Sequence, residues 1–293
     1  MRWNRKYLLF LPGILVATGA WAQENMLFGY GQPKGRITST EINEASGLIG
    51  SAENAGFFWT HNDSGDAARI FLIDDSARLR ATYYLQGIVA RDWEDIAMVK
   101  RSERNYLLVG DIGDNKNRYP FVYVHLFEEP TGNGATKRID TIPKENITTF
   151  VMKYEDGPRD AESLFFDPVD DYLYVIGKRE LQAGIYRTIL PEIPTDTLIL
   201  KRVGTIPHTF ITSADIRADG TEILMKNLLG VFYWNRKRTE SVPQALKRPA
   251  VILPYRPEPQ GEAIAFSRDG KGYYTLGESA LGLNAILYFY QRR

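Results

Sequence analysis

Cysteine is absent from the chain of 293 residues. Its absence excludes disulfides, thiolate-bound metals, a cysteine nucleophile and a lipid-anchored N-terminal cysteine. Histidine is scarce, with three in the whole chain, which leaves few candidates for a general base near neutral pH. The sequence patterns of GxSxG serine hydrolases, HExxH metalloproteases, P-loop enzymes, dinucleotide-binding enzymes and EF-hands are also missing.

Neither sign of charge dominates, with 36 Lys and Arg against 36 Asp and Glu. No basic stripe is present that could neutralise phosphates, so a nucleic-acid partner is not expected. Helical periodicity is lacking too, because no segment sustains the i, i+3, i+4 spacing over three turns. A parallel α/β enzyme is therefore not expected either, since its strands need crossover helices.

The N-terminal segment has the pattern of a secretory signal peptide. Three basic residues among the first six precede the apolar stretch YLLFLPGILVATGA, and small residues stand at Ala20 and Ala22. The stretch is short for a membrane span and is interrupted by Pro12 and Gly13. We therefore expect cleavage after Ala22, a mature protein without a membrane span, and a secreted or periplasmic location. A retained N-terminal anchor is the alternative.

Five similar segments recur along the chain, and each ends in Leu or Ile. They are EASGL (44–48), DWEDI (92–96), DAESL (160–164), TSADI (212–216) and QGEAI (260–264). The steps between their last residues are 48, 68, 52 and 48 positions, and the longest can hold an insertion around TGNGATKRID. Two or three further short runs of aromatic and β-branched residues follow each segment. Four short strands in each repeat of about 50 residues are typical of a β-propeller blade.

The expected fold is therefore all-β, a propeller of five four-stranded antiparallel blades. Six blades are the alternative, and a two-sheet sandwich stays open as well. The last repeat ends after its third strand, so GRITSTEIN (35–43) is expected to supply the missing strand and close the ring. The expected domain organisation is a signal peptide at 1–22, a linker at 23–34 and one propeller domain at 35–293.

Polar residues stand where the first strand of each repeat begins and where the second ends, and a blade brings these two places together near the axis. Turn-forming residues that cap backbone N–H groups explain part of this set. They do not explain glutamate at the same repeat position three times. Carboxylates at close quarters repel one another unless a cation neutralises them, and Ca²⁺ prefers six to eight oxygen ligands. The predicted ligands of Ca²⁺ or another divalent cation are Glu44, Asn62, Glu94, Asp95, Glu162, Asp215 and Glu262.

Basic residues accompany these acids and have two interpretations. They either pair with the neighbouring carboxylates or hold an anionic ligand beside the metal. The candidates for ligand binding are Arg91, Arg118, Arg159, Lys178 and Lys226. The candidate catalytic bases are His61, Asp111 and His208, although a lone histidine near a loop is more often structural.

The motifs WTHNDSGD, DWEDIA, VGDIGDN, RDAESL and QGEAIA together resemble a group of secreted bacterial β-propeller proteins of poorly defined function. More distantly, the chain is similar to phytase-like and gluconolactonase-like propellers, over roughly residues 35–291. The similarity to phytase-like propellers implies calcium at the acidic mouth and hydrolysis of phosphate esters. The similarity to gluconolactonase-like propellers implies one divalent cation held by Glu, Asn and Asp. The fourth repeat departs from the pattern, because TSADI lacks the glutamate of its neighbours.

Two functions from different classes follow. The first is an exported propeller that holds a divalent cation at its axial mouth and binds or hydrolyses a small anionic ligand, such as a phosphate ester or lactone. The second is a non-catalytic propeller that binds a protein or glycan on the same face.

Overall fold

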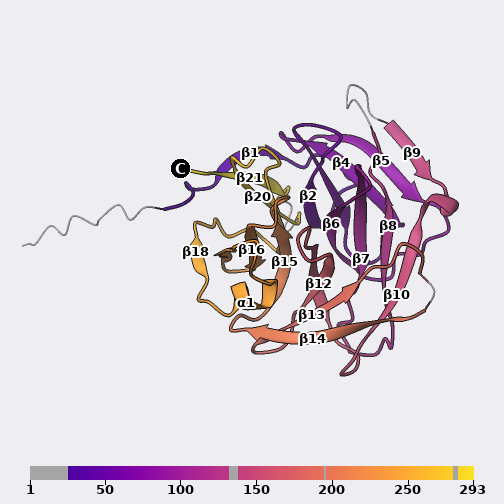
Figure 1. Ribbon diagram of the computed structural model, residues 1–293. Coiled ribbons are helices and arrows are strands. Elements are labelled where there is room, and N and C mark those ends of the chain that lie inside the picture. Colours follow the sequence, from indigo (N-terminus) through magenta and orange to yellow (C-terminus); the bar gives the residue numbers. More distant parts are fainter. Residues whose placement is uncertain (1–25, 132–137, 195, 280–282) are drawn as a thin grey trace, which may run out of the picture.

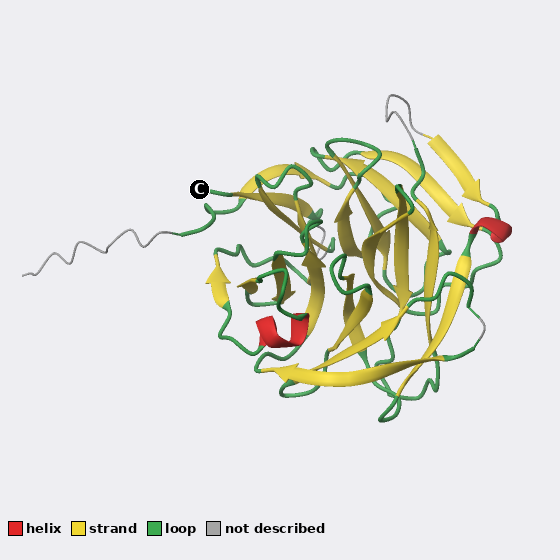
Figure 2. Cartoon of the chain, in the orientation of Figure 1, coloured by secondary structure: helices red, strands yellow, loops and turns green. Residues whose placement is uncertain are grey.

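The computed structural model describes residues 26–131, 138–194, 196–279 and 283–293. The predicted signal peptide lies outside these residues, as do part of the linker and part of the TGNGATKRID insertion. The described residues form an all-β structure of strands β1 to β21, with one short α-helix and one 3-10 helix (Figures 1 and 2). This confirms the predicted all-β class, and the arrangement is compatible with a β-propeller.

The strands form antiparallel groups of four in chain order, and the bounds of the first two groups are as follows. The first is β2 (Ala45–Gly50), β3 (Phe57–Asn62), β4 (Arg69–Asp74) and β5 (Leu79–Leu85), extended by β9 (Arg138–Ile142). The second is β6 (Trp93–Arg101), β7 (Arg104–Asp111), β8 (Val122–Glu128) and β10 (Thr148–Tyr154). The strand β9 pairs parallel to β5, so the predicted insertion adds an edge strand to the first group, and a 3-10 helix (Lys144–Asn146) follows it.

The remaining groups complete the fold. The third is β11 (Ala161–Phe166), β12 (Tyr172–Gly177), β13 (Ala183–Ile189) and β14 (Leu198–Ile206). The fourth is β15 (Ile211–Ile216), β16 (Glu222–Asn227), β17 (Val231–Asn235) and β18 (Val251–Leu253), with α1 (Val242–Leu246) before β18. The fifth is β19 (Gly261–Phe266), β20 (Gly272–Gly277), β21 (Ile286–Gln291) and β1 (Gln32–Arg36). A parallel pair of β10 with β14 joins the second and third groups into one eight-stranded sheet.

The N-terminal strand completes the last group. Strand β1 pairs antiparallel with β21, and Figure 1 shows the two side by side near the C-terminus. An N-terminal strand was predicted at 35–43; in the structure it begins three residues earlier and ends seven residues earlier, at Gln32–Arg36. Pairing of the two ends of the chain leaves β21 with no open edge, which protects it from pairing with another molecule.

The first strand of each group lies innermost, and we call β2, β6, β11, β15 and β19 the inner strands. Their contacts run from β2 to β6, β11, β15 and β19 and return to β2. The four six-residue inner strands, β2, β11, β15 and β19, each contain two or more Ala, Ser or Gly residues, as in ASGLIG and GEAIAF, and are almost entirely buried. Small side chains fit here because strands that converge on one axis leave little room between them.

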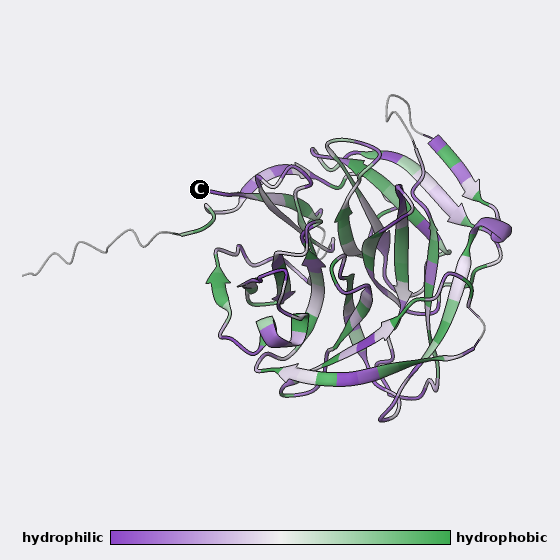
Figure 3. Ribbon diagram, viewed as in Figure 1, coloured by the Kyte–Doolittle hydropathy of each residue, from purple (hydrophilic) through white to green (hydrophobic). Residues whose placement is uncertain are grey.

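The apolar core is divided among the interfaces between neighbouring groups. One cluster lies between the first and second groups and includes Trp59 and Trp93. Four more fill the other interfaces, the last of them between the fifth and first groups. In Figure 3 the hydrophobic residues, in green, lie mainly on the strands, and hydrophilic residues, in purple, are frequent in the turns and loops. The polar side chains that could form a site therefore lie mainly at the strand ends.

Candidate metal centre

A β-bulge begins most of the inner strands and decides where the glutamates point. The register of β6 on β7 skips Glu94, that of β11 on β12 skips Glu162, and that of β19 on β20 skips Glu262. The register of β15 on β16 skips Thr212 at the same place. A bulged residue has no partner across the ladder, and its side chain is redirected out of the sheet. The repeated glutamate of the sequence is thus a repeated bulge residue.

These glutamates meet aspartates and a further glutamate from the strand ends. Three overlapping groups of carboxylates each have ligand atoms within 4.8 Å of one another. Asp63 and Glu94 each belong to two groups, so the three merge into one set. We call this set the acidic cluster; its members are Asp63, Asp92, Glu94, Asp160, Glu162, Glu262 and Glu278.

Burial and mutual repulsion raise the pKa values of several members. The pKa of Asp92 rises to about 6, first through burial and then through the charges of Asp63 and Asp160. Burial, followed by the charges of Asp63 and Asp92, raises the pKa of Glu94 well above its usual range. The pKa of Glu278 rises to about 8 through burial and its neighbour Glu262. A nearby cation would reverse this repulsion.

Two basic side chains from the end of β12 compensate part of this charge. The ammonium group of Lys178 forms an ion pair with Oε1 of Glu162, and Arg179 pairs with Asp160 at 2.6 Å between Nε and Oδ2. The second oxygen of Glu162, Oε2, is buried and has no hydrogen-bond partner among the described residues. The seven carboxylates therefore outnumber these two cations, and one buried carboxylate oxygen is left without a donor.

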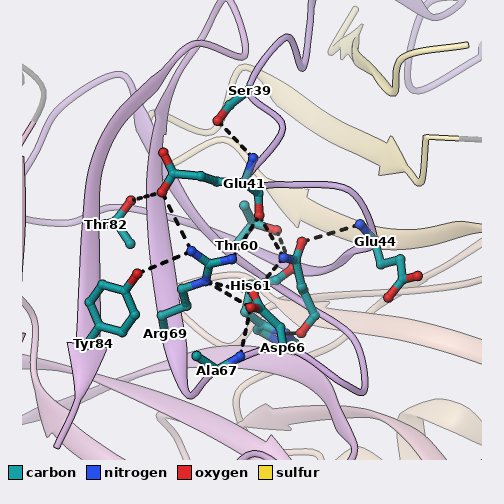
Figure 4. A network of polar contacts seen from close by, with 11 residues as sticks. Ser39, Glu41, Glu44, Thr60, His61, Asp66, Ala67, Arg69, Thr82 and Tyr84 are labelled. Carbon is teal, nitrogen blue, oxygen red and sulfur yellow. Dashed lines mark hydrogen bonds and ion pairs between the residues drawn. The ribbon is translucent and has the colours of Figure 1, made fainter.

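Two predicted metal ligands, Glu44 and Asn62, lie beside the acidic cluster. Asn62 donates to the carbonyl of Glu41 at 2.8 Å and to Asp66 at 2.6 Å, while its Oδ1 accepts from the backbone N–H of Glu44 at 3.3 Å. Figure 4 shows this network, with the carboxylate of Glu44 directed away from it. The amide of Asn62 thus holds the loop, and the exposed Glu44 lies close enough to Glu278 to raise its pKa.

The structure places two other predicted ligands, Asp95 and Asp215, away from the acidic cluster. The buried carboxyl of Asp95 accepts hydrogen bonds from two neighbouring inner strands, at the N–H groups of Leu164 (3.1 Å) and Ala214 (3.2 Å). Asp215 accepts from the N–H of Phe266 at 2.8 Å. Both carboxyls are satisfied by backbone donors, which is the arrangement of structural residues.

The position of Asp215 follows from the register of the fourth inner strand. Ser213 lies opposite Lys226, as Asp95 lies opposite Gly110 in the second group. Asp215 is therefore two residues deeper than the sequence repeat suggested, and Thr212 takes the place of the glutamate. The hydroxyl of Thr212 donates to the carbonyl of Gly261 at 3.1 Å, which joins the fourth and fifth groups.

The candidate bases all lie in enclosed or occupied positions. His61 is fully buried, with its Nδ1 2.9 Å from the carbonyl of Asn62, and burial lowers its pKa to about 4. Asp111 accepts from the N–H of Arg91 at 2.9 Å. The ring of His208 stacks on Phe232, with 3.8 Å between centroids, on the outer part of the fourth group. None of the three belongs to the acidic cluster.

Most of the predicted ligand-binding cations are held by neighbours. Arg91 pairs with Asp111 at 3.2 Å and lies over the ring of Tyr119. Arg159 forms ion pairs of 2.7 Å with Asp156 and Glu180. Lys226 is buried and donates to the carbonyl of Gly261. Arg118 is exposed. Of the five, Lys178 is the one that forms an ion pair with a member of the acidic cluster among the described residues, while the charge of Lys226 acts on Glu262.

Four members of the acidic cluster were absent from the predicted ligand set. They are Asp63, Asp92, Asp160 and Glu278. Each stands at an inner-strand start or a second-strand end, which is the position that the repeat pattern marks. The repeat therefore held the signal for them, but Asp in a loop is equally expected as a turn residue.

No protein-family model matches the chain, and no curated protein matches it. Among the described residues, no helix has the length and apolar character needed to cross a membrane.

Proposed function

We propose that the protein is a five-bladed β-propeller. Three observations support five rather than six blades: the groups of four strands, the ring of contacts among the inner strands, and an apolar cluster at each interface between neighbours. Each blade buries apolar surface on both faces, which is how propeller blades stabilise one another.

We further propose that the acidic cluster binds a divalent cation, with Ca²⁺ as the first choice. The observation that carries this proposal is the merging of three carboxylate groups through Asp63 and Glu94. Hard cations with oxygen ligands fit such a set, and carboxylates from several strands suit the flexible coordination of Ca²⁺. The unpartnered Oε2 of Glu162 and the raised pKa of Glu94 support it as well.

The proposed activity is binding or hydrolysis of a small anionic ligand, such as a phosphate ester or lactone, at this cation. When bound, the cation would polarise a phosphoryl or carbonyl oxygen and lower the pKa of a coordinated water. From the chain itself, Lys178 and Arg179 stand beside the carboxylates and can orient an anion. Export after removal of residues 1–22 is part of the same proposal.

A second candidate function is favoured by exposed apolar residues on the loops around the same face. Val89 is 83% exposed, Leu181 91% and Leu229 86%. They stand before β6, after β12 and after β16, which are the loops that also hold the polar strand ends. Exposed apolar side chains around a polar mouth fit a protein or glycan partner, with any cation serving stability alone.

Thermal unfolding of the protein in EDTA, and again after addition of Ca²⁺, tests cation binding. A cation that binds the folded state raises the melting temperature, by several degrees for a tight site. We expect this shift to be lost in Glu94→Gln and Asp63→Asn. It should persist in Glu128→Gln, whose exposed carboxylate pairs with Arg104. An unchanged melting curve on Ca²⁺ addition contradicts the proposal.

Turnover separates the two candidate functions once the cation is established. A panel of phosphate esters and lactones is offered with Ca²⁺ present. Turnover that is lost in Glu94→Gln but kept in Glu128→Gln supports the enzyme. No turnover, with the Ca²⁺ shift intact, favours the binding module.

A further inference from the structure

A cavity of about 500 Å³ lies at the other end of the inner strands from the acidic cluster. The acidic residues stand at the strand starts, whereas the cavity is lined by residues at or near the strand ends, including Ile49, Met98, Phe166, Ile216 and Phe266. Each of the five inner strands contributes to its wall. Apolar side chains such as Phe166 and Phe266 share the wall with polar and charged ones such as Asn105 and Arg268. A concave space of this size that combines an apolar surface with a few polar groups is what small-molecule sites usually provide.

The cavity and the acidic cluster are separated by a hydrogen-bonded layer. Asp95 accepts from the N–H groups of Leu164 and Ala214 and from the hydroxyl of Ser213, which links three inner strands. No member of the acidic cluster lines the cavity. The hydroxyl of Ser213 also accepts from the N–H of Ile264 at 3.2 Å. The cavity is therefore a second site, independent of the proposed cation site.

Three basic side chains line the cavity, and two of them are held in ion pairs. Lys100 pairs with Glu103 at 2.9 Å, and Arg217 pairs with Glu222 at 2.7 Å. The side chain of Arg268 forms no hydrogen bond or ion pair with any residue that the structure describes. Its positive charge acts on the buried carboxyl of Asp215, which also lines the cavity.

The stem of Arg268 is held in place by a close backbone approach. A Cβ atom at Gly50 would lie 2.7 Å from Cγ of Arg268, so glycine at this position lets the arginine lie against the end of β2. A guanidinium held by its stem at the edge of a cavity matches the geometry of a carboxylate, which it can bind through two parallel hydrogen bonds.

We propose that this cavity binds a small molecule with an apolar, preferably aromatic, body and a carboxylate group. The body contacts Phe166, Ile216 and Phe266, and the carboxylate pairs with Arg268. The ion pairs of Lys100 and Arg217 leave Arg268 as the anchoring cation. The apolar side chains of the wall select against small inorganic anions, which gain nothing from them.

Isothermal titration with naphthoate tests the proposal, with naphthamide as the uncharged probe of the same shape. We expect naphthoate to bind, naphthamide to bind at least about tenfold more weakly, and Arg268→Gln to weaken naphthoate by a similar factor. Lys271→Gln is the matched control, because this exposed base on the next turn pairs with Asp269 and does not line the cavity. Met98→Trp, which fills the cavity from a half-buried position, should abolish binding.

Three results would overturn the proposal: no naphthoate binding, equal binding of naphthoate and naphthamide, or unchanged binding in Arg268→Gln. EDTA and Glu94→Gln should leave naphthoate binding as it is. A loss of naphthoate binding in EDTA or in Glu94→Gln would show that the cavity and the acidic cluster act as one site. It would overturn the proposal of a separate cavity site. Circular dichroism of each variant establishes that it is folded before titration.

Discussion

The carboxyl of Asp95, on β6, accepts a hydrogen bond of 3.1 Å from the backbone N–H of Leu164, on β11, 69 positions away. The same oxygen accepts from the N–H of Ala214, on β15, at 3.2 Å. One side chain thus joins three inner strands at the axis. A fully buried aspartate is costly, and the donors that surround it are what make the position favourable.

Replacement of Asp95 should destabilise the fold. In Asp95→Ala the buried N–H groups of Leu164 and Ala214 lose their acceptor. We therefore expect the free energy of unfolding to fall by about 3–5 kcal/mol. Asp95→Asn retains one acceptor oxygen and should lose less. Urea denaturation measures both, with Asp140→Ala as the control, because Asp140 is a partly exposed residue of the edge strand β9, far from the inner strands in the sheet order. Equal stability of Asp95→Ala and the control would show that these hydrogen bonds contribute nothing net.

Lys178 should compete with the cation for the acidic cluster. Its ammonium group pairs with Glu162. Burial raises the pKa values of Glu94 and Glu262, and the charge of Lys178 opposes this rise. Lys178→Met removes this charge, so without Ca²⁺ the repelling carboxylates should destabilise the protein by about 1–3 kcal/mol. With the competitor gone, the Ca²⁺ affinity should rise several-fold.

Calorimetric titration with Ca²⁺ and urea denaturation in EDTA measure the two effects. Lys116→Met is the control, because Lys116 is an exposed residue of the loop after β7. A Ca²⁺ affinity that falls in Lys178→Met would mean that the lysine supports the cation site rather than competing for it.

The fold could be predicted from the sequence because its signal is repeated. The five segments from EASGL to QGEAI each begin an inner strand, and the aromatic runs after them are the following strands. The parallel pairings of β9 with β5 and of β10 with β14 left no trace in the sequence. Parallel edge contacts depend on how neighbouring groups meet, which local patterns do not record.

The candidate site could be predicted only in part, because register decides which side chains converge. Glu94, Glu162 and Glu262 were predicted together and belong to the acidic cluster. Asp215 matched Asp95 in the aligned segments, yet it lies two residues deeper, since Ser213 is the residue opposite Lys226. A shift of even one residue moves a side chain to the other face of a strand, and no sequence pattern fixed the register of this repeat.

Acid should destabilise the protein through its buried histidines. Burial lowers the pKa of His125 from 6.5 to about 4, so the unfolded chain takes up a proton that the folded chain refuses. The contribution of neutral His125 to the free energy of unfolding is therefore fully present above about pH 6.5, and it is lost as the pH decreases toward 4. The loss attributable to His125 reaches about 3 kcal/mol at its lower end.

The measurement is urea denaturation of His125→Gln between pH 7 and pH 4. The variant should lose less stability than the wild type over this range, whatever its stability at pH 7. His208→Gln is the control, because the ring of His208 is only partly buried and stacks on Phe232. Parallel pH profiles of wild type and His125→Gln would show that His125 takes up its proton equally in both states.

Closure by β1 should depend on the absence of a side chain at Gly35. A Cβ atom there would lie 1.9 Å from the carbonyl oxygen of Ser76, a backbone atom that cannot move aside cheaply. Gly35→Ala should therefore push β1 from β21 and destabilise the protein by about 1–3 kcal/mol. Gly29→Ala is the matched control in the same segment, because its Cβ would meet Gln291 at an ordinary 3.6 Å. Hydrogen exchange should show faster exchange on β21 in Gly35→Ala alone, since loss of β1 exposes that edge. Unchanged exchange on β21 would mean that the strand tolerates the side chain and that the ring is not closed by this contact.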